Sequence, residues 1–162
     1  MNGDLLRHRR VLVVGASAGI GRAFAVAAVR GGAKVVLTAR RETALAAAVE
    51  EAGGGIAVAG DLTDDASRRG VIDTAVDALG QIDLVLSTVG VATLGYAKDA
   101  DARAWEHTFR TNVIALNQVV REVLPHLAPG ARWGSTSRTS WLSAITLVRN
   151  VCSHARASAS LA

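Results

Sequence analysis

Three glycines, Gly15, Gly19 and Gly21, stand between an apolar run and an alanine-rich segment. The run, residues 11–14, is apolar and largely β-branched, which predicts a buried strand, and residues 22–29 predict a helix. A strand, a glycine turn and a helix form the geometry that binds a dinucleotide, because glycines let the backbone approach a pyrophosphate at the helix N-terminus. An ordinary tight turn of an α/β domain is the alternative interpretation.

Two arginines, Arg40 and Arg41, directly follow a second predicted strand, residues 34–39. In a dinucleotide fold the end of this strand lies beside the adenosine ribose, where an acidic residue binds the 2′-hydroxyl of NAD and an arginine favours the 2′-phosphate of NADP. Ala39 carries no carboxylate, and Arg40 offers a planar fork of donors. We therefore expect NADP rather than NAD, with Arg40 on the phosphate. The alternative is that both arginines only cap the strand in solvent.

A carboxylate, Asp61, follows a third short apolar run, residues 56–59. Ligands of open α/β sheets bind at the carboxyl ends of the strands, which places Asp61 at the expected site. Asp61 or Asp64 is equally suited to cap the next helix, and the two roles are compatible. That helix, residues 64–79, is amphipathic, and we expect Arg68 on its polar side.

The elements that must position these residues alternate along the chain. Strands are predicted at residues 11–14, 34–39, 56–60 and 82–86, and helices at residues 22–29, 42–52, 64–79 and 99–127, the last with a break near Thr111 and Asn112. This alternation predicts an α/β fold with a doubly wound, Rossmann-like parallel sheet. We expect the strand order 3-2-1-4, with a weak fifth strand and an incomplete C-terminal edge.

Bulk properties exclude several other classes. The 162 residues are half apolar, with a single cysteine, which fits one domain in a reducing, cytoplasmic compartment without a disulfide. No apolar run approaches the about 20 residues of a membrane span, and no long apolar segment precedes the glycine turn as a signal peptide would require. The net charge of +4 is scattered, so we expect no nucleic acid, no membrane and no metal.

The glycine turn resembles that of the short-chain dehydrogenase/reductase family, Thr-Gly-x-x-x-Gly-x-Gly, with Val14 in place of the threonine. The resemblance runs from about Arg9 to Leu127. It implies an oxidoreductase that transfers a hydride between a nicotinamide cofactor and a small carbonyl or alcohol. It also implies that Ser17 contacts phosphate and that Asp61 contacts adenine. The expected cofactor residues are Gly15, Ser17, Ala18, Gly19, Ile20, Gly21, Arg40, Asp61, Leu62 and Gly90.

Two further segments compare with the family. Residues 87–90, Ser-Thr-Val-Gly, stand where the family has Asn-Asn-Ala-Gly, so the glycine is kept and both amides are lost. Asn112, after Trp105 on the long helix, corresponds to the catalytic asparagine that helps to hold a water in the family's proton relay. A polar residue that satisfies a helix kink is the alternative interpretation of Asn112.

The composition changes after Ala131, which suggests residues 1–131 as the nucleotide-binding part and residues 132–162 as a divergent tail of the same domain. The tail has no acidic residue, and residues 132–137 look like a poor strand. Thr139, Cys152 and Arg156 match the family's catalytic Ser, Tyr and Lys by position only. A thiol is a weak donor and Arg differs in shape from Lys, so we expect little or no carbonyl reduction. Cys152 as a reactive thiol or as a small buried residue stays open.

Three functions remain open at this point: an NADP-dependent oxidoreductase, a nucleotide-binding remnant without turnover, and a non-catalytic dimerisation module. The third would use the apolar face of residues 113–124, which would also form a homo-oligomer. The family's later strands, helix and substrate loop have no counterpart in the chain. A shifted reading frame is one hypothesis for the tail, with Trp133 and Trp141 partly exposed, and the coding DNA would test it.

Overall fold

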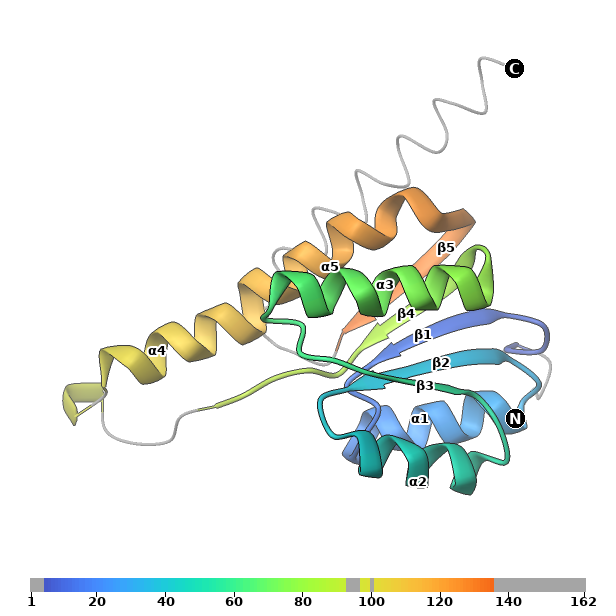
Figure 1. The fold of residues 1–162 in the computed structure, drawn as a ribbon, viewed down its shortest axis with the longest axis horizontal. Helices are drawn as coiled ribbons and strands as arrows, with labels where there is room; N and C mark the ends of the chain where they lie inside the picture. Colours follow the sequence, from blue (N-terminus) through green and yellow to red (C-terminus); the bar gives the residue numbers. More distant parts are fainter. Residues whose placement is uncertain (1–4, 93–96, 100, 136–162) are drawn as a thin grey trace, which may run out of the picture.

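A parallel sheet of five strands forms the centre of the structure, a computed structural model that describes residues 5–92, 97–99 and 101–135 (Figure 1). Its strands lie in the order β3-β2-β1-β4-β5, so the predicted order and the Rossmann-like α/β fold are confirmed. The strands are β1 (Arg10–Val14), β2 (Lys34–Ala39), β3 (Ile56–Ala59), β4 (Ile82–Ser87) and β5 (Leu127–Ser135).

Helices cover both faces of the sheet, because successive side chains of a strand point to opposite faces (Figure 1). Val11 and Val13 of β1 pack with α1 (Gly19–Arg30) and α2 (Glu42–Ala52). Leu12 and Val14 pack instead with α3 (Asp65–Leu79) and α5 (Leu116–Val123). All four side chains are essentially inaccessible, which explains why this strand is apolar throughout its centre.

The predicted break in the long helix is present. A short 3-10 turn (Ala97–Asp99) precedes α4 (Ala102–Phe109), and a π-helical segment (Arg110–Ala115) joins α4 to α5. A second 3-10 turn (Leu124–His126) follows α5. Figure 1 shows α4 extending away from the sheet, and none of its residues is buried.

The apolar face predicted for residues 113–124 is largely used inside the molecule. Leu116, Val119 and Val123 are buried against the sheet. The outward apolar side chains of this helical run are Trp105, Phe109 and Ile114, each about half exposed at 54%, 50% and 52%. A partner that binds here would therefore meet a different set of residues from the predicted face.

Residues 132–135 belong to a regular strand, so the expectation of a poor strand there is wrong for the described residues. β5 pairs with β4 through Leu84↔Arg132 and Val85↔Trp133, and half-buried Trp133 packs on the α3/α5 core. The register shifts between Ile82 and Leu84, where β5 contains Pro129 and Gly130. These two residues hide the strand in the sequence, because both are rare inside strands. Thr139, Trp141, Cys152 and Arg156 lie outside the described residues.

Arg68 is only 2% exposed, so its expected position on the polar side of α3 is wrong. It lies on the same helix face as buried Val71, Ile72 and Ala75, and its charge is met by acidic groups of α3 and α5. Those partners are not adjacent in sequence, and helical periodicity by itself does not reveal them. No helix among residues 5–92, 97–99 and 101–135 has the length and hydropathy needed to cross a membrane.

An ion pair ties the starts of β1 and β4 together. Arg10 donates from its backbone N–H (2.8 Å) and Nε (2.9 Å) to Oδ2 of Asp83, and from Nη2 to Oδ1 (2.9 Å). These hydrogen bonds hold the pKa of Asp83 below its ordinary value. Because the folded-state pKa is the lower one, the pair stabilises the fold at neutral pH, and that contribution is lost as pH falls through the folded-state pKa.

We therefore expect Asp83→Asn to lower the free energy of unfolding at pH 7 and to have a smaller effect at about pH 2.5, below the ordinary aspartate pKa, because the ion pair is lost as the folded-state carboxylate becomes protonated. Urea unfolding at the two pH values measures the difference. Asp73→Asn, at an exposed position of α3, is the matched control. An equal loss for Asp83→Asn at both pH values would contradict the assignment.

Candidate functional site

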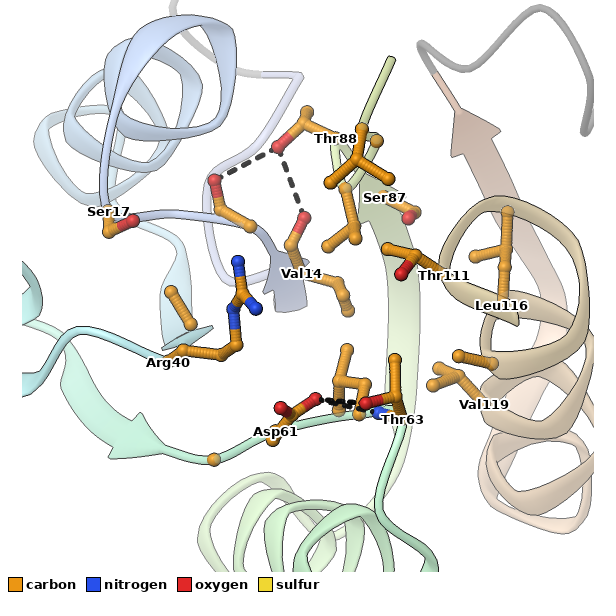
Figure 2. A pocket seen from close by; sticks show the side chains of 18 of the residues that line it. Val14, Ser17, Arg40, Asp61, Thr63, Ser87, Thr88, Thr111, Leu116 and Val119 are labelled. Carbon is orange, nitrogen blue, oxygen red and sulfur yellow. Dashed lines mark hydrogen bonds between the residues drawn. The ribbon is translucent and has the colours of Figure 1, made fainter. Parts of the chain in front are cut away.

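A cavity of about 610 Å³ opens at the carboxyl ends of the strands (Figure 2). This is the edge of an open α/β sheet where ligands bind. The ends of β1 to β4 form one side, and the π-helical segment and α5 form the other. The cavity is lined by Val14, Gly15, Ser17, Ala18, Ala39, Arg40, Arg41, Gly60, Asp61, Leu62, Thr63, Ser87, Thr88, Val89, Gly90, Val91, Thr111, Ala115, Leu116 and Val119.

The glycine turn forms the floor of the cavity beside α1. The N–H groups of Gly15 and Ala16 both donate to the carbonyl oxygen of Thr38 (2.8 and 3.0 Å), which ties the turn to β2. Gly15 and Gly19 adopt positive φ values of 90° and 55°, a region that glycine enters without strain. A Cβ at Gly19 would meet nothing within 4 Å, so a ligand could come close to the backbone at this position.

Gly21 is buried and has a packing function. A Cβ on Gly21 would collide with the carbonyl oxygen of Gly15 and with Oγ1 of Thr88. Of the predicted turn residues, Gly15, Ser17 and Ala18 line the cavity, whereas Gly19, Ile20 and Gly21 do not. Ile20 is 65% exposed. The third glycine therefore lets α1 approach the turn closely enough to point its N-terminus at the cavity.

Thr88 joins the end of β4 to the glycine turn. Its Oγ1 lies 3.1 Å from the carbonyl oxygen of Val14 and 3.0 Å from that of Gly15 (Figure 2). From the sequence, Thr88 is noted only as a replacement for an asparagine of the family pattern. The structure shows that its hydroxyl connects the turn to β4 across the sheet.

Two cations stand at the mouth of the cavity, at the end of β2. Figure 2 shows the guanidinium of Arg40 pointing into the cavity between Ser17 and Asp61. Nη2 of Arg41 donates to Oγ of Ser17 at 3.4 Å. Arg40 makes no hydrogen bond to any other described residue, so its donors face the cavity and solvent. The arrangement suits a dianionic group between Arg40 and Ser17.

Asp61 faces these cations from the end of β3. Its Oδ1 accepts from the backbone N–H (2.9 Å) and the hydroxyl (2.7 Å) of Thr63. The Thr63 backbone N–H is the main reason that the pKa of Asp61 lies below its ordinary value, and the charge of Arg40 also lowers it. The neighbouring Asp64 caps α3 by accepting from Ser67 N–H at 2.8 Å. The capping function therefore falls to Asp64, while Asp61 presents a charged carboxylate at the cavity.

The wall opposite the turn is apolar, with two hydroxyls. Leu116 and Val119 of α5 line it, together with Thr111 of the π-helical segment and Ser87 of β4 (Figure 2). The hydroxyl oxygens of Ser87 and Thr111 are buried and have no hydrogen-bond partner among the described residues. Such a surface fits a flat heteroaromatic ring with polar edges. Sequence reasoning missed the α5 residues, because an apolar helical stripe looks the same whether it lines a cavity or fills a core.

Asn112 does not line the cavity. Its Oδ1 accepts from the backbone N–H of Val91 and its Nδ2 donates to the carbonyl oxygen of Val91, both at 2.8 Å. The side chain thus clamps the segment after β4, which carries Gly90, to the π-helical segment. In the part of the chain that the structure describes, no group of three or more His, Cys, Asp or Glu side chains is placed to hold a metal ion.

The short chain dehydrogenase family profile matches residues 9–144, most of the chain. This chain belongs to the short-chain dehydrogenase/reductase family. The match continues past Leu127, so the expected end of the resemblance was placed too early.

Curated relatives of this short-chain dehydrogenase/reductase are longer than the chain. It is 35% identical over 126 residues to versicolorin reductase stcU of Emericella nidulans, covering 75% of this chain and 48% of that protein. It is 31% identical over 146 residues to an L-rhamnose 1-dehydrogenase (NAD(P)(+)) of Sphingomonas sp., covering 87% and 58%. The chain thus spans about half the length of the curated relatives it matches.

Solved structures of the family superpose on the chain. A mutant short-chain dehydrogenase/reductase from Serratia marcescens has a TM-score of 0.76 at 25% identity and covers 83% of this chain and 58% of its own. A short chain dehydrogenase from Burkholderia cenocepacia in complex with NADP has a TM-score of 0.74 at 28% identity and covers 80% and 55%.

Proposed function

We propose that the cavity binds NADP(H) and that the chain is part of an oxidoreductase that transfers hydride between this cofactor and a small carbonyl or alcohol. The observation that carries the proposal is the placement of Arg40 and Arg41 at the end of β2, on the rim of a cavity whose floor is a glycine turn. When bound, the nicotinamide supplies the hydride, and the protein binds and orients the cofactor.

The residues fit the parts of such a cofactor. Arg40 would hold the 2′-phosphate, since an arginine at this strand end takes the place of the carboxylate that selects NAD. The N-terminus of α1 and Ser17 would hold the pyrophosphate. Asp61 and Leu62, with the apolar wall of α5, would hold the adenine. The buried hydroxyls of Ser87 and Thr111, which have no partner in the part of the chain that the structure describes, support this fit, because a polar ligand edge would satisfy them.

The catalytic assignments rest on family position. Asn112 would act through the segment it clamps, because both ends of its amide are bonded to Val91. Thr139, Cys152 and Arg156 would occupy the places of the family's Ser, Tyr and Lys. Since neither a thiol nor a guanidinium replaces that Tyr–Lys pair, we propose that carbonyl reduction by this chain is slow. We also propose a cytoplasmic location, and a homo-oligomer that would use the outward side chains Trp105, Phe109 and Ile114, since the predicted face is largely buried.

Titration of the full chain with NADPH and NADH tests the proposal, followed by a turnover assay against a panel of carbonyl compounds. Saturable NADPH binding, tighter than NADH binding, is expected. Binding of neither nucleotide at millimolar concentration would refute the assignment of the cavity. Substrate-dependent NADPH oxidation at an ordinary enzymatic rate would refute the expectation of slow reduction.

Charge reversal of Arg40 gives the sharpest result on cofactor choice. Arg40→Asp is expected to weaken NADPH binding by about 10- to 150-fold, the equivalent of one lost charge-assisted contact of about 1.5–3 kcal/mol, and to leave NADH binding nearly unchanged. Fluorescence titration measures both affinities. Arg69→Asp, an exposed position of α3 outside the cavity lining, is the matched control for net charge. Equal weakening of NADPH and NADH by Arg40→Asp would contradict the 2′-phosphate assignment.

A further inference from the structure

The guanidinium of Arg68 joins three segments behind the cavity. Its Nε and Nη2 donate to Oε1 of Glu122 at 3.0 and 2.9 Å, and its Nη1 lies 2.9 Å from Oε1 of Gln118, both on α5. Nη1 also lies 3.0 Å from Oδ1 of Asp65 on α3 and 3.2 Å from the carbonyl oxygen of Leu62. One buried cation therefore connects α3, α5 and the segment that follows β3.

The bond to Leu62 acts on the peptide that orients Asp61. The carbonyl of Leu62 and the N–H of Thr63 belong to the same peptide group, which is planar. Arg68 binds the oxygen of this peptide, and Oδ1 of Asp61 accepts from its N–H. The peptide plane is thus held from both sides, and rotation of the plane would release the Asp61 carboxylate from its direction into the cavity.

The bonds to α5 act on the opposite wall. Leu116 and Val119, which line the cavity, lie on the same helix as Gln118 and Glu122. Arg68 holds this helix to α3 by charge-assisted bonds in a buried setting, where such bonds are strong and geometrically specific. Arg68 therefore adds a polar connection between the Asp61 side of the cavity and the Val119 side to the apolar packing of α3 on α5.

We propose that Arg68 is a positioning residue for the adenosine half of the cavity, acting through the Leu62–Thr63 peptide on one wall and through α5 on the other. This rests on the proposed function for the identity of the ligand. Arg68 does not line the cavity and touches no ligand. Arg68 instead fixes the positions of Asp61, Leu116 and Val119, which line the cavity.

Two variants separate positioning from stability. Arg68→Met keeps a similar stem but leaves Glu122 without its cation, which destabilises the fold. The double variant Arg68→Met/Glu122→Met removes both charges, and replacing a buried ion pair by apolar side chains is often neutral for stability. In both variants the Leu62 carbonyl loses its donor. Leu79→Ala, buried at the far end of α3, is the matched control for a destabilised helix.

Calorimetric titration of the full chain with 2′,5′-ADP and with nicotinamide mononucleotide measures the two halves of the site. The double variant is expected to bind 2′,5′-ADP about tenfold more weakly than the wild type and to leave the mononucleotide affinity unchanged, with a melting temperature no lower than that of Leu79→Ala. Leu79→Ala is expected to lower the melting temperature without this selective loss. Unchanged 2′,5′-ADP affinity in the double variant, or an equal loss in Leu79→Ala, would overturn the proposal.

A measurement without ligand keeps the two proposals apart. The Thr63 amide hydrogen, which is bonded to Asp61, is expected to exchange with solvent at least about tenfold faster in the double variant, while amides of α1 keep their rates. Failure of the wild type to bind 2′,5′-ADP would contradict the proposed function. The exchange rate of the Thr63 amide would still test whether Arg68 positions the Leu62–Thr63 peptide. An unchanged Thr63 rate in the double variant overturns the positioning role.

Discussion

Replacement of Gly21 by alanine is expected to destabilise the protein by about 3 kcal/mol, the upper end of the cost of overpacking, and to weaken NADPH binding with it. The added Cβ would meet the Gly15 carbonyl and the Thr88 hydroxyl, closer than real Cβ atoms come. The Gly15 carbonyl is backbone, so neither it nor the helix can move away cheaply. Relief requires α1 to shift away from the turn, and its N-terminus would then leave the cavity floor.

Urea unfolding and NADPH titration of Gly21→Ala measure the two effects. Gly70→Ala is the matched control, because Gly70 lies in α3 where a Cβ meets nothing within 4 Å. That substitution is expected to be neutral or to stabilise by up to about 1 kcal/mol, since alanine favours the helix. A Gly21→Ala protein with the stability and NADPH affinity of the wild type would show that the packing argument is wrong.

Loss of the Asn112 side chain is expected to lower the free energy of unfolding by about 2–4 kcal/mol. Asn112→Ala leaves the N–H and the carbonyl of Val91 without the partners they have at 2.8 Å, and a stranded polar group costs about 1–3 kcal/mol. Asn112→Asp keeps the acceptor and loses the donor, so its loss is expected to be intermediate. Because Val91 lines the cavity, NADPH affinity is expected to fall in the same order.

Asn117→Ala, at an exposed position of α5, is the matched control for removal of an asparagine from this helical run. Chemical denaturation of the three variants measures the effect. A stability of Asn112→Ala equal to that of Asn117→Ala would contradict the clamp. A stable Asn112→Ala protein that has lost only turnover would favour the water-holding role that the family implies.

The fold followed from local patterns in this chain. Residues 11–14 and 35–37 are apolar because they are buried on both faces of the sheet, and the glycines at 15, 19 and 21 mark the turn where the cavity forms. Alternation of strands with helices restricts the sheet to few orders, since crossovers are right-handed. Arg40 and Asp61 could be placed at the cavity for the same reason: both directly follow a parallel strand.

The rest depended on contacts between residues far apart in sequence. Arg68 is buried because Glu122, 54 residues later, neutralises it, whereas an arginine is ordinarily expected in solvent. Asn112 bonds to Val91 across 21 residues, which composition and spacing do not encode. β5 forms despite Pro129 and Gly130 because β4 offers backbone partners and Trp133 a place in the core. Sequence alone thus determined the strands, the turns and the edge of the sheet that holds the site, which are set by local backbone preference and burial. Tertiary structure alone decided which polar groups pair across that edge, because a buried charge or amide is stabilised only by the partners that packing brings to it.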